Sequence, residues 1–203
     1  MKLRENCRYD LATVSSMGVR ITPFNRQPVQ SSSLFEMQST SAETNVLNIS
    51  ASLGLDTLVM TRFVQDSAIA SFIKAELRKR NIGYTGPDIP QGGPWGYRHQ
   101  FNIADSGYGL RGPVVQNDRA GEVGRTISAS DFELERLFAK DGVRILHLSG
   151  LIAAMSESTT AACLEIARYA KANGTLISFD LNYRASFWKG REDALRRDFQ
   201  EIA

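Results

Sequence analysis

Residues 144–180 decide the fold class, and they read RILHLSGLIAAMSESTTAACLEIARYAKANGTLISFD. Two short apolar runs, Arg144 to Leu148 and Leu176 to Asp180, have the length and composition of buried strands. The apolar residues between them recur at helical spacing, which predicts a helix over Ser156 to Asn173 that ends at Gly174. A strand, a helix and a second strand in this order indicate a parallel sheet covered by helices.

The same alternation continues toward both ends of the chain. Short apolar runs predict strands over Tyr9 to Val14 and Thr57 to Phe63. Helical spacing and capping residues predict helices over four further segments: Ala42 to Leu53, the residues that follow Ser67, Ser130 to Ala139, and Arg191 to Ile202. The chain is therefore predicted to have an α/β fold.

Residues 83–124 differ in composition from the rest of the chain. They hold most of the 16 glycines and most of the six prolines, and aromatic residues interrupt them regularly. Helical periodicity is absent from this region. We predict short strands and turns that project from the α/β body.

Charge and hydropathy exclude several classes of protein. The 203-residue chain carries 24 Lys and Arg against 22 Asp and Glu, so neither nucleic acid nor an acidic membrane surface is expected as a partner. No apolar run approaches the roughly 18 residues of a membrane span, and the start, MKLRENCRYD, lacks the apolar region of a secretory signal. Cys7 and Cys163 are too isolated for a disulfide framework or a zinc site. We expect a cytoplasmic protein.

Polar residues follow the predicted strand Leu176 to Asp180, at the edge where open parallel sheets bind ligands. Asp180, Asn182 and Arg184 alternate directly after its apolar run. Such a trio can bind a polyol, a phosphate or a carboxylate, because the planar guanidinium group suits an oxyanion. The alternative is a strand-to-helix turn with an Asp cap and a surface arginine.

The histidines and glycines do not indicate a cofactor site. His147 lies between two leucines of a predicted strand, as a core residue would, and His99 lies in the glycine-rich region, where we expect it to be exposed. Two distant histidines without acidic partners at ligand spacing predict no metal site. The glycine-rich loops that bind phosphates in P-loop and dinucleotide-binding proteins are absent, which disfavours a nicotinamide-dependent enzyme.

Five segments, taken in order, carry a resemblance to a known family: YDLATVSSMGVRITP (9–23), AETNVLNISASLGL (42–55), TRFVQDSAIASFIKAELRKRNI (61–82), ILHLSGLIAAMS (145–156) and ISFDLNYRASFW (177–188). The chain resembles the ribokinase-like (PfkB) carbohydrate kinases, in particular the 2-keto-3-deoxygluconate kinase and fructokinase branch. The resemblance spans nearly the whole chain but corresponds only to the N-terminal part of such a kinase. It implies an incomplete ribokinase-like parallel sheet with helices on both faces and a small β lid.

The resemblance also implies a domain plan and a set of site residues. Residues 1–203 would form one incomplete domain, with lid strands within 9–40 and 90–125 and the α/β body in 42–82 and 126–203. The implied substrate-binding residues are Arg119, Arg184, Tyr97, Asn45 and Ser41, with Asp180 and Asn182 in the neighbourhood of the substrate or its phosphate. ATP and Mg²⁺ are the implied cofactors, a sugar or sugar acid the implied partner, and a homodimer through the lid is possible.

The sequence departs from the family at positions that matter for chemistry. The family's Gly-Gly before the Ala-Glu-x-Asn signature is Thr40-Ser41, whose side chains we expect to crowd the sugar, and its Gly-Glu after the first strand is Ser15-Ser16. No Gly-Asp dipeptide occurs anywhere, so the family's catalytic Gly-Ala-Gly-Asp loop has no counterpart and no catalytic residue is assigned. Two functions remain open: an ATP-dependent sugar or sugar-acid kinase, and an inactive fragment or sugar-binding remnant.

Overall fold

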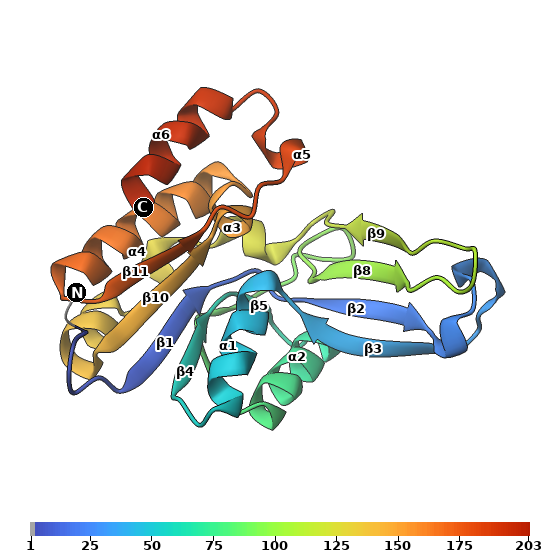
Figure 1. Cartoon of the computed structure of the whole chain (residues 1–203), viewed down its shortest axis with the longest axis horizontal. Coiled ribbons are helices and arrows are strands. Elements are labelled where there is room, and N and C mark those ends of the chain that lie inside the picture. The colour runs from blue at the N-terminus through green and yellow to red at the C-terminus, as the bar shows by residue number, and fades with distance from the viewer. Residues whose placement is uncertain (1–2) are drawn as a thin grey trace.

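A computed structural model describes residues 3–203, which form an α/β body and a β-sheet that projects from it (Figure 1). The body contains a parallel five-stranded sheet of order β11-β10-β1-β4-β6. Its strands are β1 (Tyr9–Val14), β4 (Thr57–Met60), β6 (Ile82–Thr85), β10 (Val143–Ser149) and β11 (Leu176–Asp180). The parallel sheet predicted from the alternating pattern is confirmed.

Helices cover both faces of this sheet, because alternate residues of its strands point to opposite sides. The helices are α1 (Ala42–Ser52), α2 (Ala68–Lys79), α4 (Glu157–Ala172) and α6 (Glu192–Ile202), with the short α3 (Gly150–Ala153) and α5 (Ala185–Trp188). Ala12 and Val14 of β1 belong to an apolar cluster with residues of α4 and α6, whereas Leu11 belongs to a second cluster with residues of α1 and α2.

Serine side chains set the starts of three helices. Ser41, Ser67 and Ser156 each accept a hydrogen bond from a backbone N–H in the first turn of α1, α2 and α4. Such caps satisfy donors that have no partner within the helix, so the sequence locates these starts to within a residue.

The helix predicted over Ser130 to Ala139 is wrong. The structure has a 3-10 turn at Ala129–Asp131, an extended residue at Phe132 and a π-helix at Glu135–Asp141. The carboxylate of Asp131 accepts two hydrogen bonds from Arg62, at 2.6 and 2.5 Å, and a third from the backbone N–H of Ser128. These contacts from a distant segment hold the chain in a turn where local periodicity favours a helix.

The projecting sheet, called the lid below, has four strands in the order β3-β2-β8-β9. They are β2 (Gly18–Pro23), β3 (Phe35–Thr40), β8 (Gln100–Asp105) and β9 (Val114–Asp118), and a two-stranded sheet of β5 (Phe63–Val64) and β7 (Asp88–Ile89) lies near its base. All four lid strands lie within the ranges implied by the resemblance, although the same range also contains β1, which belongs to the body. The projecting part of residues 83–124 begins later than residue 83, because β6 pairs with β4 in the body sheet and the next lid strand is β8.

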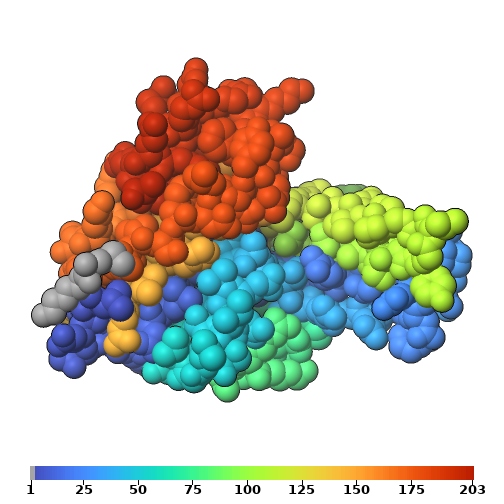
Figure 2. Space-filling view, in the orientation of Figure 1, coloured from blue at the N-terminus to red at the C-terminus, as the bar shows by residue number. Residues whose placement is uncertain are grey.

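The lid extends to one side of the body, and the C-terminal residues (red) form the upper part of the molecule in the view of Figure 2. Within residues 3–203, no helix combines the length and apolar character needed to cross a membrane.

Candidate functional site

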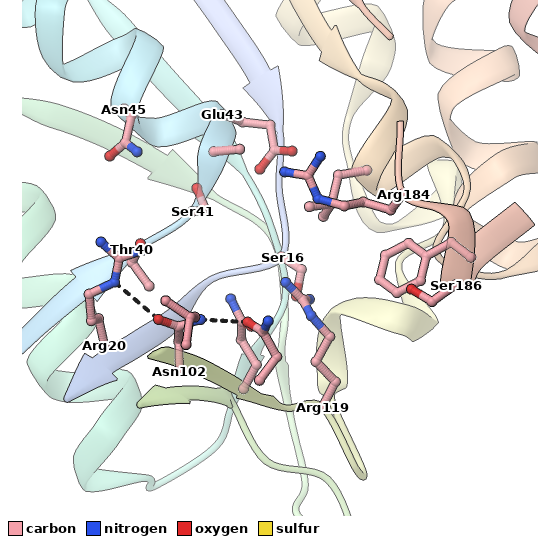
Figure 3. Close-up of a pocket in the computed structure, with 16 residues that line it drawn as sticks. Ser16, Arg20, Thr40, Ser41, Glu43, Asn45, Asn102, Arg119, Arg184 and Ser186 are labelled. Atoms are coloured by element: carbon pink, nitrogen blue, oxygen red, sulfur yellow. Dashed lines mark hydrogen bonds between the residues drawn. The ribbon is translucent and has the colours of Figure 1, made fainter. Parts of the chain in front are cut away.

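A cavity of about 530 Å³ lies where the lid meets the body (Figure 3), a size typical of small-molecule sites. All four lid strands or the residues that follow them contribute to its wall, and the body contributes Ser16 after β1, the start of α1, α3 and the residues from Arg184 into α5. The cavity therefore lies beyond the carboxyl ends of the parallel strands, where the sequence places a ligand.

Two arginines far apart in the sequence line this cavity, Arg119 after β9 and Arg184 after β11. Arg119 is held in place: its Nη1 donates to both carboxylate oxygens of Glu122 at 2.8 and 3.0 Å, and its guanidinium carbon lies 5.8 Å from the ring centre of Phe187. Arg184 is exposed and donates to the carbonyl of Tyr183 at 2.9 Å. Arg184 has no carboxylate partner among residues 3–203, so its charge is available to an anionic ligand.

Glu122 is a site residue that sequence reasoning missed. Its side chain is fully buried, and besides Arg119 it accepts a hydrogen bond of 2.5 Å from Oγ of Ser16. The resembling family carries a glutamate at position 16, and a carboxylate from position 122 occupies this neighbourhood instead. The spacing of Arg119 and Glu122 in NDRAGE, three residues apart, is the signal that could have identified the pair.

The start of α1 forms another wall. Thr40 and Ser41 both line the cavity, and the buried Oγ of Ser41 accepts a hydrogen bond of 3.0 Å from the backbone N–H of Thr44 and so caps the helix. Asn45 lines the cavity and is exposed. Glu43, which sequence reasoning also missed, is buried; its Oε2 accepts from Ser15 at 2.7 Å, and its Oε1 has no partner.

Three residues of the implied site lie outside the cavity wall. Asn182 donates its backbone N–H to Asp180 at 3.0 Å and its side-chain amide to Ser149 at 3.1 Å, which shapes the turn after β11. Asp180 and Asn182 thus act as the strand-to-helix turn of the alternative interpretation, and that turn carries Arg184 into the site. Tyr97 is 39% exposed and does not line the cavity either.

The expectation that His99 is exposed is wrong, since only 2% of it is accessible. Its Nδ1 lies 3.0 Å from the carbonyl oxygen of Met17, and its Nε2 accepts from the backbone N–H of Val64 at 3.3 Å. Burial holds the pKa of His99 below its usual value. His147 is also buried, lies 3.1 Å from Oγ of Ser178, and has a pKa lowered by burial. Neither histidine lines the cavity.

The comparisons with known proteins agree with the resemblance. The chain is 24% identical over 180 residues to a 2-dehydro-3-deoxygalactonokinase from Haloferax volcanii, which covers 88% of this chain and 54% of that protein. Among solved structures, a PfkB family carbohydrate kinase from Listeria grayi shares 26% identity at a TM-score of 0.81, covering 95% of this chain and 57% of that one. A 2-dehydro-3-deoxygluconokinase from Thermotoga maritima shares 23% identity at a TM-score of 0.84, covering 96% and 58%.

A further similar fold, a sugar kinase from Pyrococcus horikoshii, was solved in complex with ATP and shares 16% identity at a TM-score of 0.75, covering 95% of this chain and 59% of that one. A scan against protein-family models found no match. The chain spans a little over half the length of the relatives it matches. By sequence and fold, it is similar to the N-terminal part of the PfkB carbohydrate kinases, whose ribokinase-like architecture it shares.

Proposed function

We propose that this chain is the sugar-binding part of a carbohydrate kinase and that it binds a sugar acid in the cavity between lid and body. The observation that carries the proposal is that Arg119 and Arg184, one from the lid and one from the loop after β11, line the same cavity. The names of the similar proteins, which are kinases of keto-deoxy sugar acids, support the substrate class.

The residues of the wall suggest a division of roles. The exposed guanidinium of Arg184 is suited to bind the ligand's carboxylate through two parallel hydrogen bonds. Arg119, held by Glu122, retains Nε and Nη2 as donors, and the amide of Asn45 can donate to or accept from a sugar hydroxyl. A lid over the sugar keeps water away from the hydroxyl group that is to be phosphorylated.

ATP and Mg²⁺ belong to the proposed activity of the whole kinase and not to the residues of this chain. Residues 3–203 contain no group of three or more His, Cys, Asp or Glu side chains that could hold a metal ion. The first turn of α1, the long helix that begins at the cavity, carries the buried Glu43, whose carboxyl group disfavours a phosphate there. We therefore derive no phosphoryl-transfer step from these residues, and a sugar-binding remnant without kinase activity remains the second candidate.

Isothermal titration calorimetry on the purified chain tests the proposal. 2-Keto-3-deoxygluconate and gluconate are expected to bind, and Arg184→Gln is expected to weaken binding by about tenfold or more because one charge-assisted contact is lost. Arg196→Gln is the matched control, since Arg196 is an exposed arginine on α6 outside the cavity. Equal affinities for the wild type and Arg184→Gln, or no binding of either acid, would contradict the proposal.

The proposal extends to a second copy of this chain at the lid. The lid face opposite the cavity presents Phe35 and Met37 of β3 and Val114 of β9, which are 42%, 38% and 63% exposed. Light scattering during size-exclusion chromatography is expected to give a dimer for the wild type and a monomer for Met37→Asp. A monomeric wild type would exclude this association.

A further inference from the structure

The cavity face of the lid carries a row of polar side chains that the proposed carboxylate site does not use. Strand pairing sets Arg20 of β2 beside Asn102 of β8, and Asn102 beside Asn117 of β9. All three residues line the cavity. Figure 3 shows Arg20 and Arg184 on different sides of it, with Ser16 and Arg119 below Arg184 in this view.

The hydrogen bonds along this row have a fixed direction. Arg20 can only donate, and its Nε donates to Oδ1 of Asn102 at 3.1 Å. The amide nitrogen of Asn102 then donates to Oδ1 of Asn117 at 2.5 Å (Figure 3). Three donor groups of the row have no partner among the described residues: the two terminal nitrogens of Arg20 and the amide nitrogen of Asn117. A row that ends in donors is built for an anion.

A buried acceptor lies beside the row. Gln100 lines the cavity, is only 4% exposed, and its Oε1 has no hydrogen-bond partner. Its side chain packs over Gly18, where an added Cβ would lie 2.1 Å from Cγ of Gln100, so Gly18 is required for this position. A buried amide oxygen without a partner costs free energy, which a ligand hydroxyl can recover by donating to it.

The charges of the cavity are compensated unevenly. Arg119 forms an ion pair with Glu122, but Arg20 has no carboxylate within ion-pair distance among residues 3–203. Glu43 is the one acidic residue among those that line the cavity, and it lies toward Arg184 in Figure 3. Arg20 is therefore an uncompensated cation on the lid side of the cavity, away from the proposed carboxylate site.

We propose that Arg20, with Asn102 and Asn117, forms a second anion-binding site, so that the preferred ligand is a sugar acid with a further anionic group at its other end. The proposal rests on the sugar-acid function proposed above and specifies its substrate class. The second group is a carboxylate or a phosphate, since both present the paired oxygens that a guanidinium fork binds.

Calorimetry with three probes tests this site. D-Gluconate and D-glucarate have the same number of carbons and differ in whether the far end is a hydroxymethyl group or a carboxylate, and 6-phosphogluconate carries a phosphate there. The wild type is expected to bind glucarate or 6-phosphogluconate about tenfold more tightly than gluconate, with the stronger of the two identifying the group. Arg20→Gln is expected to abolish this preference, so that the dianions bind no more tightly than gluconate, and Arg20→Lys to retain part of it.

Arg26→Gln is the matched control, because Arg26 is an exposed lid arginine that does not line the cavity. It is expected to leave all three affinities unchanged, and circular dichroism melting verifies that each variant folds. Equal affinities of the wild type for the three acids, or a preference that survives in Arg20→Gln, would overturn the second site and leave the sugar-acid function standing. If glucarate or 6-phosphogluconate binds and gluconate does not, the result supports the second site alone. If none of the three acids binds, both the second site and the sugar-acid function are overturned.

Discussion

At the scale of single residues, Glu122 joins the lid to the body through one buried charge. Its carboxylate accepts from Arg119 at the end of the lid and from Ser16 after β1, and its side chain has no solvent exposure. A buried carboxylate is stable only while its partners are present, so removing one member of the pair costs more than removing both. The pair therefore fixes the orientation of Arg119.

Glu122→Gln is expected to lower the free energy of unfolding by about 2 kcal/mol, because the partly buried Arg119 loses its counter-charge. Adding Arg119→Gln should recover part of that loss, since a neutral pair replaces an unpaired cation. Urea denaturation of the two single variants and the double variant measures the coupling. Additive losses would show that the two side chains do not interact in solution.

At the scale of secondary structure, two contacts determine how elements meet at the cavity. The Ser41 cap starts α1 beside the lid, at a position where the resembling family has glycine. His99 lies directly before β8 and hydrogen-bonds to backbone groups of Met17 and Val64, so it joins the base of the lid to β5. Both contacts are buried and satisfy backbone or helix-end groups.

Ser41→Ala is expected to cost about 1 kcal/mol of stability, whereas Ser41→Gly should cost only a few tenths, because glycine is tolerated at a helix start and alanine is not. Chemical denaturation of both variants is the measurement, and Ser52→Ala at the other end of α1 is the control. A larger loss for glycine than for alanine would mean that the cap is not the source of the stabilisation.

The neutral form of His99 should make stability depend on pH. Its folded pKa is lowered by burial, so the unfolded chain binds the proton more readily, and the stabilisation is complete above the unfolded pKa of about 6.5 and is lost as the pH falls below it. His99→Gln keeps one donor and one acceptor but does not titrate. Between pH 6.5 and 5, urea denaturation should show a shallower decline for His99→Gln, by at most about 1.4 kcal/mol per pH unit.

The pKa of His147 is also lowered by burial, and this residue is present in both the wild type and His99→Gln. The difference between their two profiles of stability against pH therefore isolates the contribution of His99. Parallel profiles of the wild type and His99→Gln would mean that folding does not change the pKa of His99.

At the scale of the whole molecule, the cavity exists only because the chain passes repeatedly between body and lid. β2 and β3 leave the body between β1 and α1, and β8 and β9 leave it after β6. Each wall of the cavity therefore comes from segments far apart in the sequence. The described residues include no group of three or more His, Cys, Asp or Glu side chains that could hold a metal ion.

The purified chain is expected to show no sugar-dependent ADP release with ATP and Mg²⁺. The chain has no counterpart of the Gly-Ala-Gly-Asp loop that would stabilise the charge of the transition state, and positioning a substrate does not offset that lack. The loss of a single preorganised donor from an oxyanion hole already costs about 3 kcal/mol. A coupled assay with 2-keto-3-deoxygluconate, fructose and ribose measures it. Release above a protein-free blank that disappears in Arg184→Ala would show that this chain is a kinase by itself.

The sequence by itself determined the α/β class, most strands and helices of the body, and the starts of α1, α2 and α4. These features depend on local causes: apolar periodicity, and serine side chains that bond within one helical turn. The family resemblance added the lid and two of the three arginines that line the cavity, Arg119 and Arg184. The turn of Asp180 and Asn182 was also foreseen, as the alternative to a ligand site.

The tertiary structure alone decided what depends on distant contacts. The row of Arg20, Asn102 and Asn117 exists because β2 pairs in parallel with β8, in a register that residue spacing does not reveal. The burial of His99 and the pairing of Glu122 with Ser16 likewise join segments far apart in the chain. Local sequence carries no signal for these contacts, because their free energy appears only when lid and body pack together.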